Sequence, residues 1–386
     1  MKCLLICSYF DGKSTGSLRA LSLAKYFNAL GYDVTVYTTD HAASLLPGVK
    51  LEYIDHSLPF NDGSIFNRLY QIIRKTLYCL CGIEYHFSFR KLLSKNWNAY
   101  DVIWVSSPQP ELLDFALKIN EKIKAKIICD FRDGLLHEPL RKLNSLEVFR
   151  YKKLELSVAS KANAITTVSK EISEYFLKKY NPNHVYTITN GFDFKPREKN
   201  RGIRDSLGSS DKVNIVYTGG ISRSRSSLFN SLLTFVDAYD NLSCIEKDKL
   251  DVYFVGEYTP KEMDILRSRF TLVPKVTREE SIQYQLDADY LLLFTGEDKS
   301  VLTGKFFEYL SAQRPIIAIT SGGSINNIIH ATKSGRCFNH DEFIVLNDYL
   351  LNLRKNTILN NDELISPYWR KNLNEKVVRI IEDEIN

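Results

Sequence analysis

Residues 214–220, Asn-Ile-Val-Tyr-Thr-Gly-Gly, form an apolar run that ends in two glycines. Such a run predicts a strand buried on both faces of a parallel sheet, which enters a tight turn at Gly219 and Gly220. Residues 4–10, Leu-Leu-Ile-Cys-Ser-Tyr-Phe, begin the chain on the same plan and lead to Gly12 and Gly16. Two copies of this plan in one chain predict two α/β domains.

The segments around both runs continue the alternation of strands and helices. Apolar residues at a spacing of three and four predict an amphipathic helix from Ala20 to Leu30, which Gly31 ends. A strand at residues 33–38 then completes a βαβ unit. Further predicted strands cover 102–106, 126–131, 164–168, 185–188, 252–256, 271–274, 289–294 and 315–319. The fold class is therefore α/β, with two Rossmann-like parallel-sheet domains that we expect to face each other across a cleft.

A polar segment, residues 195–212, separates the two halves because it holds almost no large apolar side chain. We predict an N-terminal domain from 1–195 plus 370–386, a linker at 196–211, and a C-terminal domain at 212–369. The last stretch is joined to the first domain because its apolar residues recur at helical spacing and suit a helix that packs back.

Composition and charge exclude several classes of protein. The 386 residues are 44% hydrophobic and carry a net charge of only +5, which is too mild for a nucleic-acid binder. The seven cysteines are scattered, so we interpret them as reduced core residues and expect no zinc site. No apolar run is long enough for a transmembrane helix, and we expect a cytoplasmic protein.

The segment Thr303-Gly304-Lys305-Phe-Phe-Glu308 directly follows a predicted strand. A helix that starts near Gly304 would direct free N–H groups at a ligand above the sheet, and a diphosphate suits that position. Lys305 and Glu308 share a helical face, so the lysine can meet phosphate oxygens while the carboxylate accepts hydrogen bonds from ribose hydroxyls. The alternative, an exposed ion pair on a surface helix, remains open from these residues alone.

The turn after residues 214–218 is the second candidate. Gly219 and Gly220 allow the backbone to approach a phosphate closely, and Arg223 and Arg225 could neutralise it. Neither GxGxxG nor GxxxxGK[ST] occurs here, which disfavours an NAD enzyme and a P-loop protein. The alternative is an ordinary strand-to-helix turn with two solvated arginines.

With these residues in view, the chain resembles the retaining glycosyltransferase family Four, of the GT-B fold, which includes bacterial enzymes of surface-polysaccharide assembly. The resemblance spans nearly the whole chain and rests on Lys305-Phe-Phe-Glu308-Tyr, followed by Arg314-Pro315. It implies that Glu308 holds the ribose of a nucleoside diphosphate sugar, while Lys305 and the amides of Thr303 and Gly304 contact its phosphates.

One position departs from the family pattern. Many relatives carry a second glutamate eight residues before the ribose-binding one, where this chain has Ser300, and Glu297 nearby is out of register. The departure puts the contact to the donor sugar in doubt. The resemblance also places an Arg or Lys of the glycine turn against the diphosphate, and we favour Arg225 over Arg223.

On the N-terminal side the resemblance implies that Gly16 belongs to a glycine loop where donor and acceptor approach. Asp133, at the end of strand 126–131, is our candidate for contact with the transferred sugar, whereas Asp130 suits a structural cap better. Residues 190–193, Asn-Gly-Phe-Asp, match a family turn that we interpret as fixing the hinge.

The resemblance and these residues together imply a retaining, metal-independent hexosyltransferase. It would use no cofactor and would move a sugar to a saccharide or a polyprenyl-linked saccharide. Lys305, Arg225 and Asp133 would be catalytic, the two cations by stabilising the charge of the departing diphosphate. No carboxylate pair for double displacement is evident, and the absence of a DxD-like motif at a strand end predicts metal independence. The alternatives are a GT-B-like epimerase or hydrolase, which needs a general base, and a scaffold that binds the nucleotide sugar without turnover, which Ser300 would favour.

Residues 66–97 hold six Lys or Arg and one Glu among many aromatic and aliphatic residues. Such a basic amphipathic segment predicts peripheral binding at the inner face of the cytoplasmic membrane. The alternative is a set of helices that each bury one face in the core.

Overall fold

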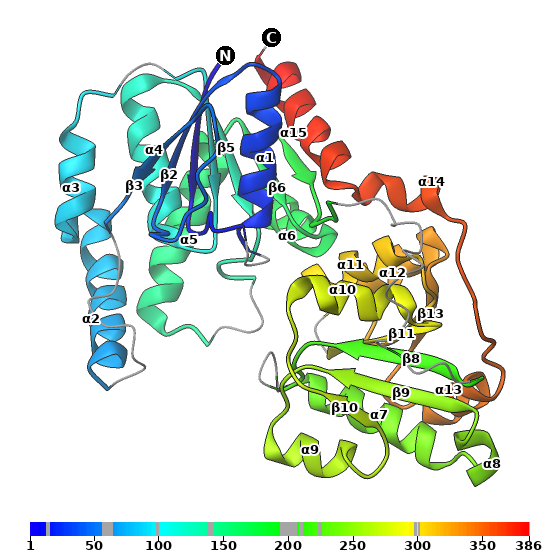
Figure 1. The fold of residues 1–386 in the computed structure, drawn as a ribbon. Coiled ribbons are helices and arrows are strands. Elements are labelled where there is room, and N and C mark those ends of the chain that lie inside the picture. Colours follow the sequence, from blue (N-terminus) through cyan, green and yellow to red (C-terminus); the bar gives the residue numbers. More distant parts are fainter. Residues whose placement is uncertain are drawn as a thin grey trace. The chain divides into compact units, whose positions relative to one another are not determined.

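A computed structural model of the chain describes residues 1–12, 16–55, 65–97, 100–137, 142–193, 207, 211–222, 226–296, 299 and 302–385. The chain forms two compact units, Met1–Thr189 with Arg370–Asn386, and Asn190–Trp369. Each unit is a parallel β-sheet covered by helices, so the predicted α/β class with two parallel sheets is confirmed (Figure 1). The predicted linker lies outside the described residues except for Leu207 and Asp211.

The N-terminal unit contains a seven-stranded sheet with the strand order β3-β2-β1-β4-β5-β6-β7. Its strands are β1 Lys2–Cys7, β2 Asp33–Thr38, β3 Val49–Tyr53, β4 Val102–Ser106, β5 Lys126–Phe131, β6 Ala164–Thr167 and β7 Val185–Thr187. Its helices are α1 Leu18–Ala29, α2 Ile65–Cys81, the 3-10 helix Gly82–Tyr85, α3 Phe87–Ser94, α4 Pro110–Ile123, α5 Ser145–Lys161, α6 Lys170–Tyr180 and the C-terminal α15 Arg370–Ile385.

The C-terminal unit contains a six-stranded sheet with the order β10-β9-β8-β11-β12-β13. Its strands are β8 Val213–Thr218, β9 Leu250–Val255, β10 Thr271–Val273, β11 Tyr290–Gly296, β12 Ile316–Thr320 and β13 Gly335–Phe338. Its helices are α7 Leu228–Asp240, α8 Cys244–Lys247, α9 Pro260–Leu266, α10 Arg278–Asp287, α11 Gly304–Ala312, α12 Ser324–Thr332, α13 Phe343–Leu351, α14 Asp362–Ile365 and the 3-10 helix Ser366–Tyr368.

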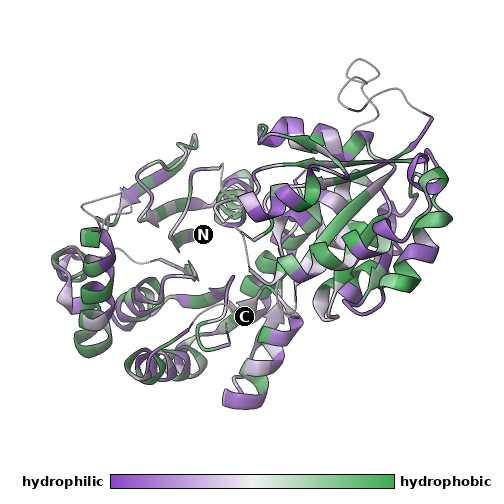
Figure 2. Cartoon of the chain, turned by 90° about the horizontal axis from the view of Figure 1, so that it is seen from below, coloured by the Kyte–Doolittle hydropathy of each residue, from purple (hydrophilic) through white to green (hydrophobic). Residues whose placement is uncertain are grey.

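Both faces of each sheet are buried, which explains why the strands read as continuous apolar runs. Ile215 and Tyr217 of β8 join the cluster beneath α7 and α13, whereas Val216 joins the cluster beneath α11 and α12. Figure 1 shows these helices on opposite faces of the sheet, and in Figure 2 the strands are mostly green. The N-terminal sheet is built in the same way, with α1 and α15 on one face.

Local signals in the sequence account for several element ends. Gly31 follows α1 in the left-handed conformation, as expected for the residue after a helix, with φ of 79°. The first predicted strand ends at Cys7 rather than at Phe10. The edge strands β3 and β13 were not predicted from the sequence, and the C-terminal helix packs against α1.

Four of the seven cysteines are buried, Cys337 is half-buried, and Cys81 and Cys244 are exposed. All seven are free thiols, in line with the reduced state expected from the sequence. The two exposed thiols correct the interpretation that every cysteine is a core residue.

Candidate functional site

The carboxyl ends of β8 and β11 mark the point in the C-terminal sheet where the strand order reverses. The chain continues from β8 toward β9 on one side and from β11 toward β12 on the other. Doubly wound folds bind ligands at such a point. Gly219 leaves β8 with a φ of 94°, and its N–H donates to the carbonyl of Val255 over 2.7 Å. Gly256 lies so close that a Cβ on it would meet the carbonyl oxygen of Gly219 at 2.6 Å. Gly256 therefore admits no side chain, whereas the positive φ of Gly219 favours glycine without requiring it.

Lys305 reaches from α11 onto this glycine turn. Its Nζ lies 4.0 Å from the centroid of the Tyr217 ring, and a Cβ added to Gly219 would meet this Nζ at 3.1 Å. The Tyr217 hydroxyl donates to the carbonyl of Gly220 over 2.9 Å, which fixes the second glycine. The fold thus brings together Lys305 and the Gly219–Gly220 turn, which the sequence presented as two separate candidates.

The start of α11 is fixed by its own residues and by β8. The hydroxyl of Thr303 accepts from the N–H of Phe306 over 3.4 Å, so α11 begins at Gly304 as predicted. One turn later, the hydroxyl of the fully buried Tyr309 accepts from the N–H of Thr218 over 3.0 Å. Burial raises the pKa of Tyr309 far above its usual value, so this hydroxyl stays neutral. The lysine is therefore carried by a helix that is tied to the end of β8.

Glu308 has a partner that the sequence did not suggest. Nε of Arg278, the first residue of α10, donates to Oε1 of Glu308 over 2.9 Å. The Glu308 side chain is 19% exposed and that of Arg278 is 37% exposed. The bond fixes one carboxylate oxygen of Glu308. A capping box formed by Thr277 and Glu280 marks the start of α10, and this was the local signal available.

Several predicted residues lie outside the described part of the chain, namely Arg223, Arg225, Glu297 and Ser300. The described residues beside them are well anchored. Ser222 donates its N–H to Oε1 of the buried Glu262 over 2.7 Å. Burial raises the pKa of Glu262, but hydrogen bonds from Ser222 and Thr259 outweigh it, so the pKa lies below its usual value.

In the N-terminal unit, Arg132 links the two predicted residues Gly16 and Asp133. Its Nη1 donates to the Gly16 carbonyl over 2.9 Å, and its Nη2 donates to Oδ2 of Asp133 over 3.1 Å. A Cβ on Gly16 would collide with this guanidinium at 2.3 Å. The Asp133 side chain is 41% exposed, so it remains accessible to a ligand. Arg132 was absent from the residues predicted to bind.

Asp130 is fully buried and held by several donors, as a structural residue would be. Arg19 donates to both of its carboxylate oxygens over 2.9 and 2.6 Å. The hydroxyls of Thr166 and Ser106 donate over 2.7 and 3.0 Å. Another nitrogen of Arg19 donates to the carbonyl of Thr189, the last residue of this segment of the unit. This network connects α1 with β4, β5 and β6.

The geometry of the C-terminal unit suits an anion with a diphosphate group. It offers an ammonium group, the first N–H groups of α11 and a glycine turn that allows close backbone approach. Among the described residues, no group of three or more His, Cys, Asp or Glu is placed to hold a metal ion. Metal independence remains a prediction.

Comparisons with known proteins agree on this architecture. Residues 17–195 match the family model described as Glycosyltransferase Family 4. Among solved structures, HepE of Anabaena, in complex with UDP and glucose, has a TM-score of 0.62 at 12% identity, over 99% of each chain. The lipopolysaccharide outer core galactosyltransferase WaaB gives 0.62 at 12% identity over 100% of both chains. Sucrose-phosphate synthase from Thermosynechococcus elongatus gives 0.64 at 14% identity, over 100% of this chain and 95% of the other. No curated protein matches the chain.

Two doubly wound units with parallel sheets, together with the solved structures of the same architecture, define the chain as a protein of the GT-B fold. More specifically, its residues 17–195 match the family model of glycosyltransferase family 4.

Proposed function

We propose that the chain is a retaining glycosyltransferase that moves a hexose-type sugar from a nucleoside diphosphate sugar to a saccharide or polyprenyl-linked saccharide in surface-polysaccharide biosynthesis. The observation that carries the proposal is the position of Lys305 Nζ over Tyr217 and beside Gly219, at the switch point of the C-terminal sheet. HepE, which has the same fold, was solved with UDP and glucose, and this supports a nucleotide-sugar donor.

In this proposal Glu308 accepts hydrogen bonds from the ribose hydroxyls with the oxygen that Arg278 leaves available. Lys305 and the amides at the start of α11 bind the diphosphate. Arg225, with Arg223 as the alternative, would add charge from the glycine turn. Catalysis rests on stabilising the negative charge that develops on the departing diphosphate, which then accepts the proton of the acceptor hydroxyl. Asp133 would meet the transferred sugar, held by Arg132.

A thermal-shift panel of UDP-, GDP-, CMP- and dTDP-sugars tests the donor site. A ligand that binds the native state raises apparent stability, so one nucleotide class should raise Tm in the wild type. Glu308→Ala and Lys305→Ala should reduce that shift, while Glu363→Ala, an exposed residue of α14 in the same unit, should leave it unchanged. Absence of any shift from a folded wild-type protein would argue against the proposal.

Turnover separates this function from its two alternatives. A transferase releases the nucleoside diphosphate only when an acceptor is present, whereas an epimerase or hydrolase turns over the donor alone. A binding scaffold would show affinity for the donor and no product with any acceptor. Loss of transfer on addition of EDTA would contradict metal independence.

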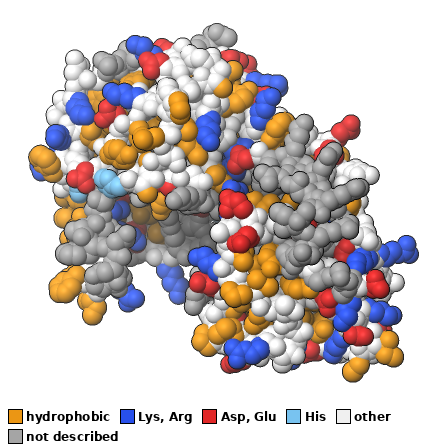
Figure 3. All heavy atoms as spheres, in the orientation of Figure 1, with side chains coloured by type: hydrophobic (Ala, Val, Ile, Leu, Met, Phe, Trp, Pro, Cys, Tyr) orange, Lys and Arg blue, Asp and Glu red, His pale blue; other side chains and the backbone are white. Residues whose placement is uncertain are grey.

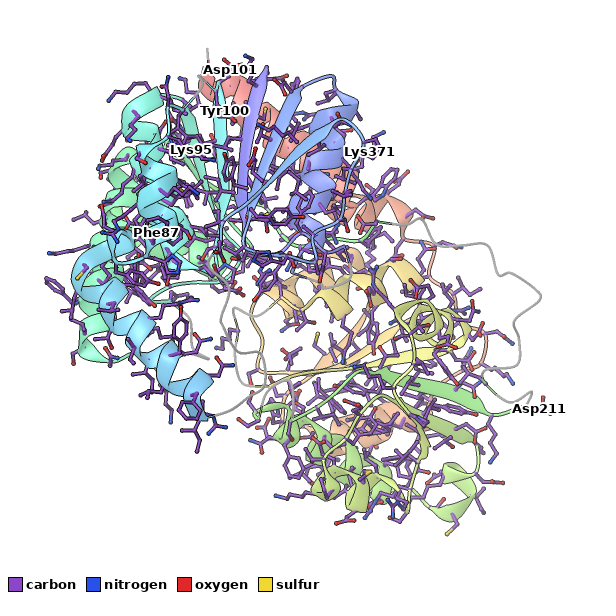
Figure 4. The ribbon with its side chains drawn as sticks, turned by 60° about the vertical axis from the view of Figure 1, so that its left-hand side comes forward. Phe87, Lys95, Tyr100, Asp101, Asp211 and Lys371 are labelled. Atoms are coloured by element: carbon purple, nitrogen blue, oxygen red, sulfur yellow. The ribbon has the colours of Figure 1, made fainter. Side chains whose placement is uncertain are left out.

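We also propose that α2 lies on an anionic membrane surface. α2 exposes a row of apolar side chains, among which Phe66 is 74% and Ile72 is 61% exposed. In Figure 3 orange side chains lie at the lower left, where Figure 1 shows α2. Phe87 at the start of α3 is 68% exposed and Lys95 follows its end, as labelled in Figure 4. No described helix is long and apolar enough to cross a membrane, so the proposed contact is parallel to the surface.

The charges of α2 have different roles, which decides how the membrane contact must be tested. Arg68 is exposed, but Arg74 lies 3.6 Å from the buried Glu111 and Lys75 lies 3.8 Å from the buried Glu147. Charge reversal at Arg74 or Lys75 would therefore place a like charge beside a buried glutamate and disturb the packing of the helix as well as its charge. They should be left intact in a membrane test.

Flotation with vesicles of phosphatidylglycerol and phosphatidylcholine is the suitable measurement. The triple variant Leu69→Ser, Ile72→Ser, Ile73→Ser should float less than wild type. Ile344→Ser on α13 removes a comparable exposed side chain, 63% exposed, and should float like wild type. Equal flotation of all three proteins would refute membrane binding through α2.

A further inference from the structure

A second polar pocket lies in the N-terminal unit, between α2, the turn that leads from β4 into α4, and the start of α5. Its volume is about 320 Å³, within the range of small-ligand sites. Its polar lining comes from Arg74, Lys75, Gln109, Lys142 and two glutamates. The turn that forms one wall follows the carboxyl end of β4, the edge of the sheet at which ligands bind in such folds.

The guanidinium of Arg74 is held in this pocket without a full set of hydrogen bonds. Its side chain is only 13% exposed, and its Nη2 lies 3.6 Å from Oε1 of Glu111, too far for a hydrogen bond. Within the described part of the chain, neither Arg74 Nε nor Gln109 Oε1 has a hydrogen-bond partner, although both atoms are buried. Buried polar atoms are normally paired, so the pocket has unused capacity for a polar ligand.

The charges of the pocket favour an anion. The carboxylates of Glu111 and Glu147 lie in the first turns of α4 and α5, where they complement the positive ends of those helices. Arg74 faces the first of them, and Lys75 Nζ lies 3.8 Å from the second. Lys142 is exposed at the rim and adds a positive charge. The side chains of the pocket therefore carry three positive and two negative charges. The N-terminal ends of α4 and α5 add positive potential to the same pocket.

The uncharged walls suit an ester rather than a bare inorganic ion. Pro108 and Pro110 flank Gln109, and the rings of Tyr78 and Tyr151 complete the lining. Tyr78 is 1% exposed. On the opposite side of α2 lies the exposed apolar row, about one helix diameter or 10 Å away.

We propose that this pocket binds a phosphate ester carried by the acceptor, with Arg74, Lys75 and Lys142 as the cationic groups. The inference rests on the proposed function, because it assigns a class to the acceptor of that reaction. The phosphate could belong to a prenyl diphosphate, to a phospholipid headgroup or to a free anion, and all three share the same chemistry.

Isothermal titration of the full chain tests the proposal, with a nucleoside diphosphate present at saturation to occupy the C-terminal site. The probes are geranyl diphosphate, geraniol, inorganic pyrophosphate and vesicles that contain phosphatidylglycerol. We expect geranyl diphosphate to bind and geraniol not to bind. The double variant Lys75→Gln, Lys142→Ala should weaken that binding by about tenfold or more, since each charge-assisted hydrogen bond contributes that much. Lys91→Ala, an exposed lysine on α3, should have no effect.

Binding of pyrophosphate with equal affinity would identify a free anion as the ligand, and preferential binding of vesicles would identify a headgroup. Either result keeps the phosphate site if the double variant weakens it. Failure of all phosphate probes to bind, or equal binding by wild type and the double variant, would overturn the proposal. Nucleotide binding is measured separately. Its absence would refute the proposed donor site, whereas its presence with no effect of the double variant would refute only this pocket.

Discussion

Replacement of Gly219 by alanine tests whether the glycine turn and Lys305 form one phosphate site. The new Cβ would lie 3.1 Å from Nζ and 3.2 Å from Cε of Lys305. These atoms are the flexible end of a long side chain, so the lysine can move aside at little cost in stability. The position that it leaves is the one over Tyr217, 4.0 Å from the ring centroid. Alanine would thus displace the charge from the proposed diphosphate while the fold persists.

The expected magnitudes separate strain from loss of function. Gly219 has a φ of 94°, and an alanine in a left-handed conformation costs about 1–2 kcal/mol. Displacement of the ammonium group removes a charge-assisted contact with a phosphate, which is worth about 1.5–3 kcal/mol. The second value corresponds to a loss of roughly 10- to 150-fold in affinity for a nucleoside diphosphate.

Gly31 provides a matched control for the strain. Its φ of 79° is also left-handed, but a Cβ there would meet nothing within 4 Å. Gly31→Ala and Gly219→Ala should lose similar free energies of unfolding in urea, whereas only Gly219→Ala should lose affinity for the diphosphate in isothermal titration. Affinity for the nucleoside without phosphates should be unchanged in both. Wild-type affinity of Gly219→Ala for the nucleoside diphosphate would refute the reasoning.

Three further predictions concern other parts of the fold. Tyr309→Phe leaves the buried N–H of Thr218 without its acceptor and should lower the free energy of unfolding by about 1–3 kcal/mol, measured in urea. A thiol reagent should modify Cys81 and Cys244 before the rest in mass spectra of the native protein, because burial raises the pKa of the buried thiols. The lowered pKa of Glu262 means that its contribution to stability is complete above about pH 4.5 and is lost as the pH falls through the folded value. Glu262→Gln should therefore lose less stability than wild type between about pH 6 and pH 3, and an identical slope would contradict this assignment.

The sequence predicted the central strands well because they are buried on both faces. The predicted strands 33–38, 102–106 and 126–131 coincide with β2, β4 and β5. The strands β3 and β13 were missed, and they lie at the ends of their sheets. β3 reads Val-Lys-Leu-Glu-Tyr and has no fully buried residue, so it lacks the apolar run that identified the others. Edge strands commonly carry such charges, which prevent pairing with other chains.

The sequence predicted those parts of the candidate site that neighbouring residues specify, but not the contacts between remote residues. Lys305 and the turn at Gly219 could each be found from neighbouring residues, but their contact depends on the strand order. Arg278 and Arg132 were missed because their partners are remote in the chain. Arg278 binds Glu308 across 30 residues, and Arg132 binds the carbonyl of Gly16 across 116 residues. Single arginines on a surface helix or after a strand carry no such information in the sequence.

The structure of HepE matches this chain at only 12% identity over 99% of both chains. Such a match is possible because much of the fold depends on backbone features that many sequences can form. The phosphate half of the proposed site depends on a left-handed turn and on the N–H groups of a helix start. Apolar patterning and glycine specify these features, and many sequences satisfy them. The ribose half depends on side chains, here Glu308 and the Arg278 that orients it. We therefore expect the phosphate site to tolerate changes in its surrounding residues as long as Gly219 is kept. Discrimination between nucleotides should instead respond to single substitutions around Glu308. Arg278→Ala should weaken binding of a ribonucleotide more than that of its 2′,3′-dideoxy analogue, and equal losses for both would place Arg278 on another part of the ligand.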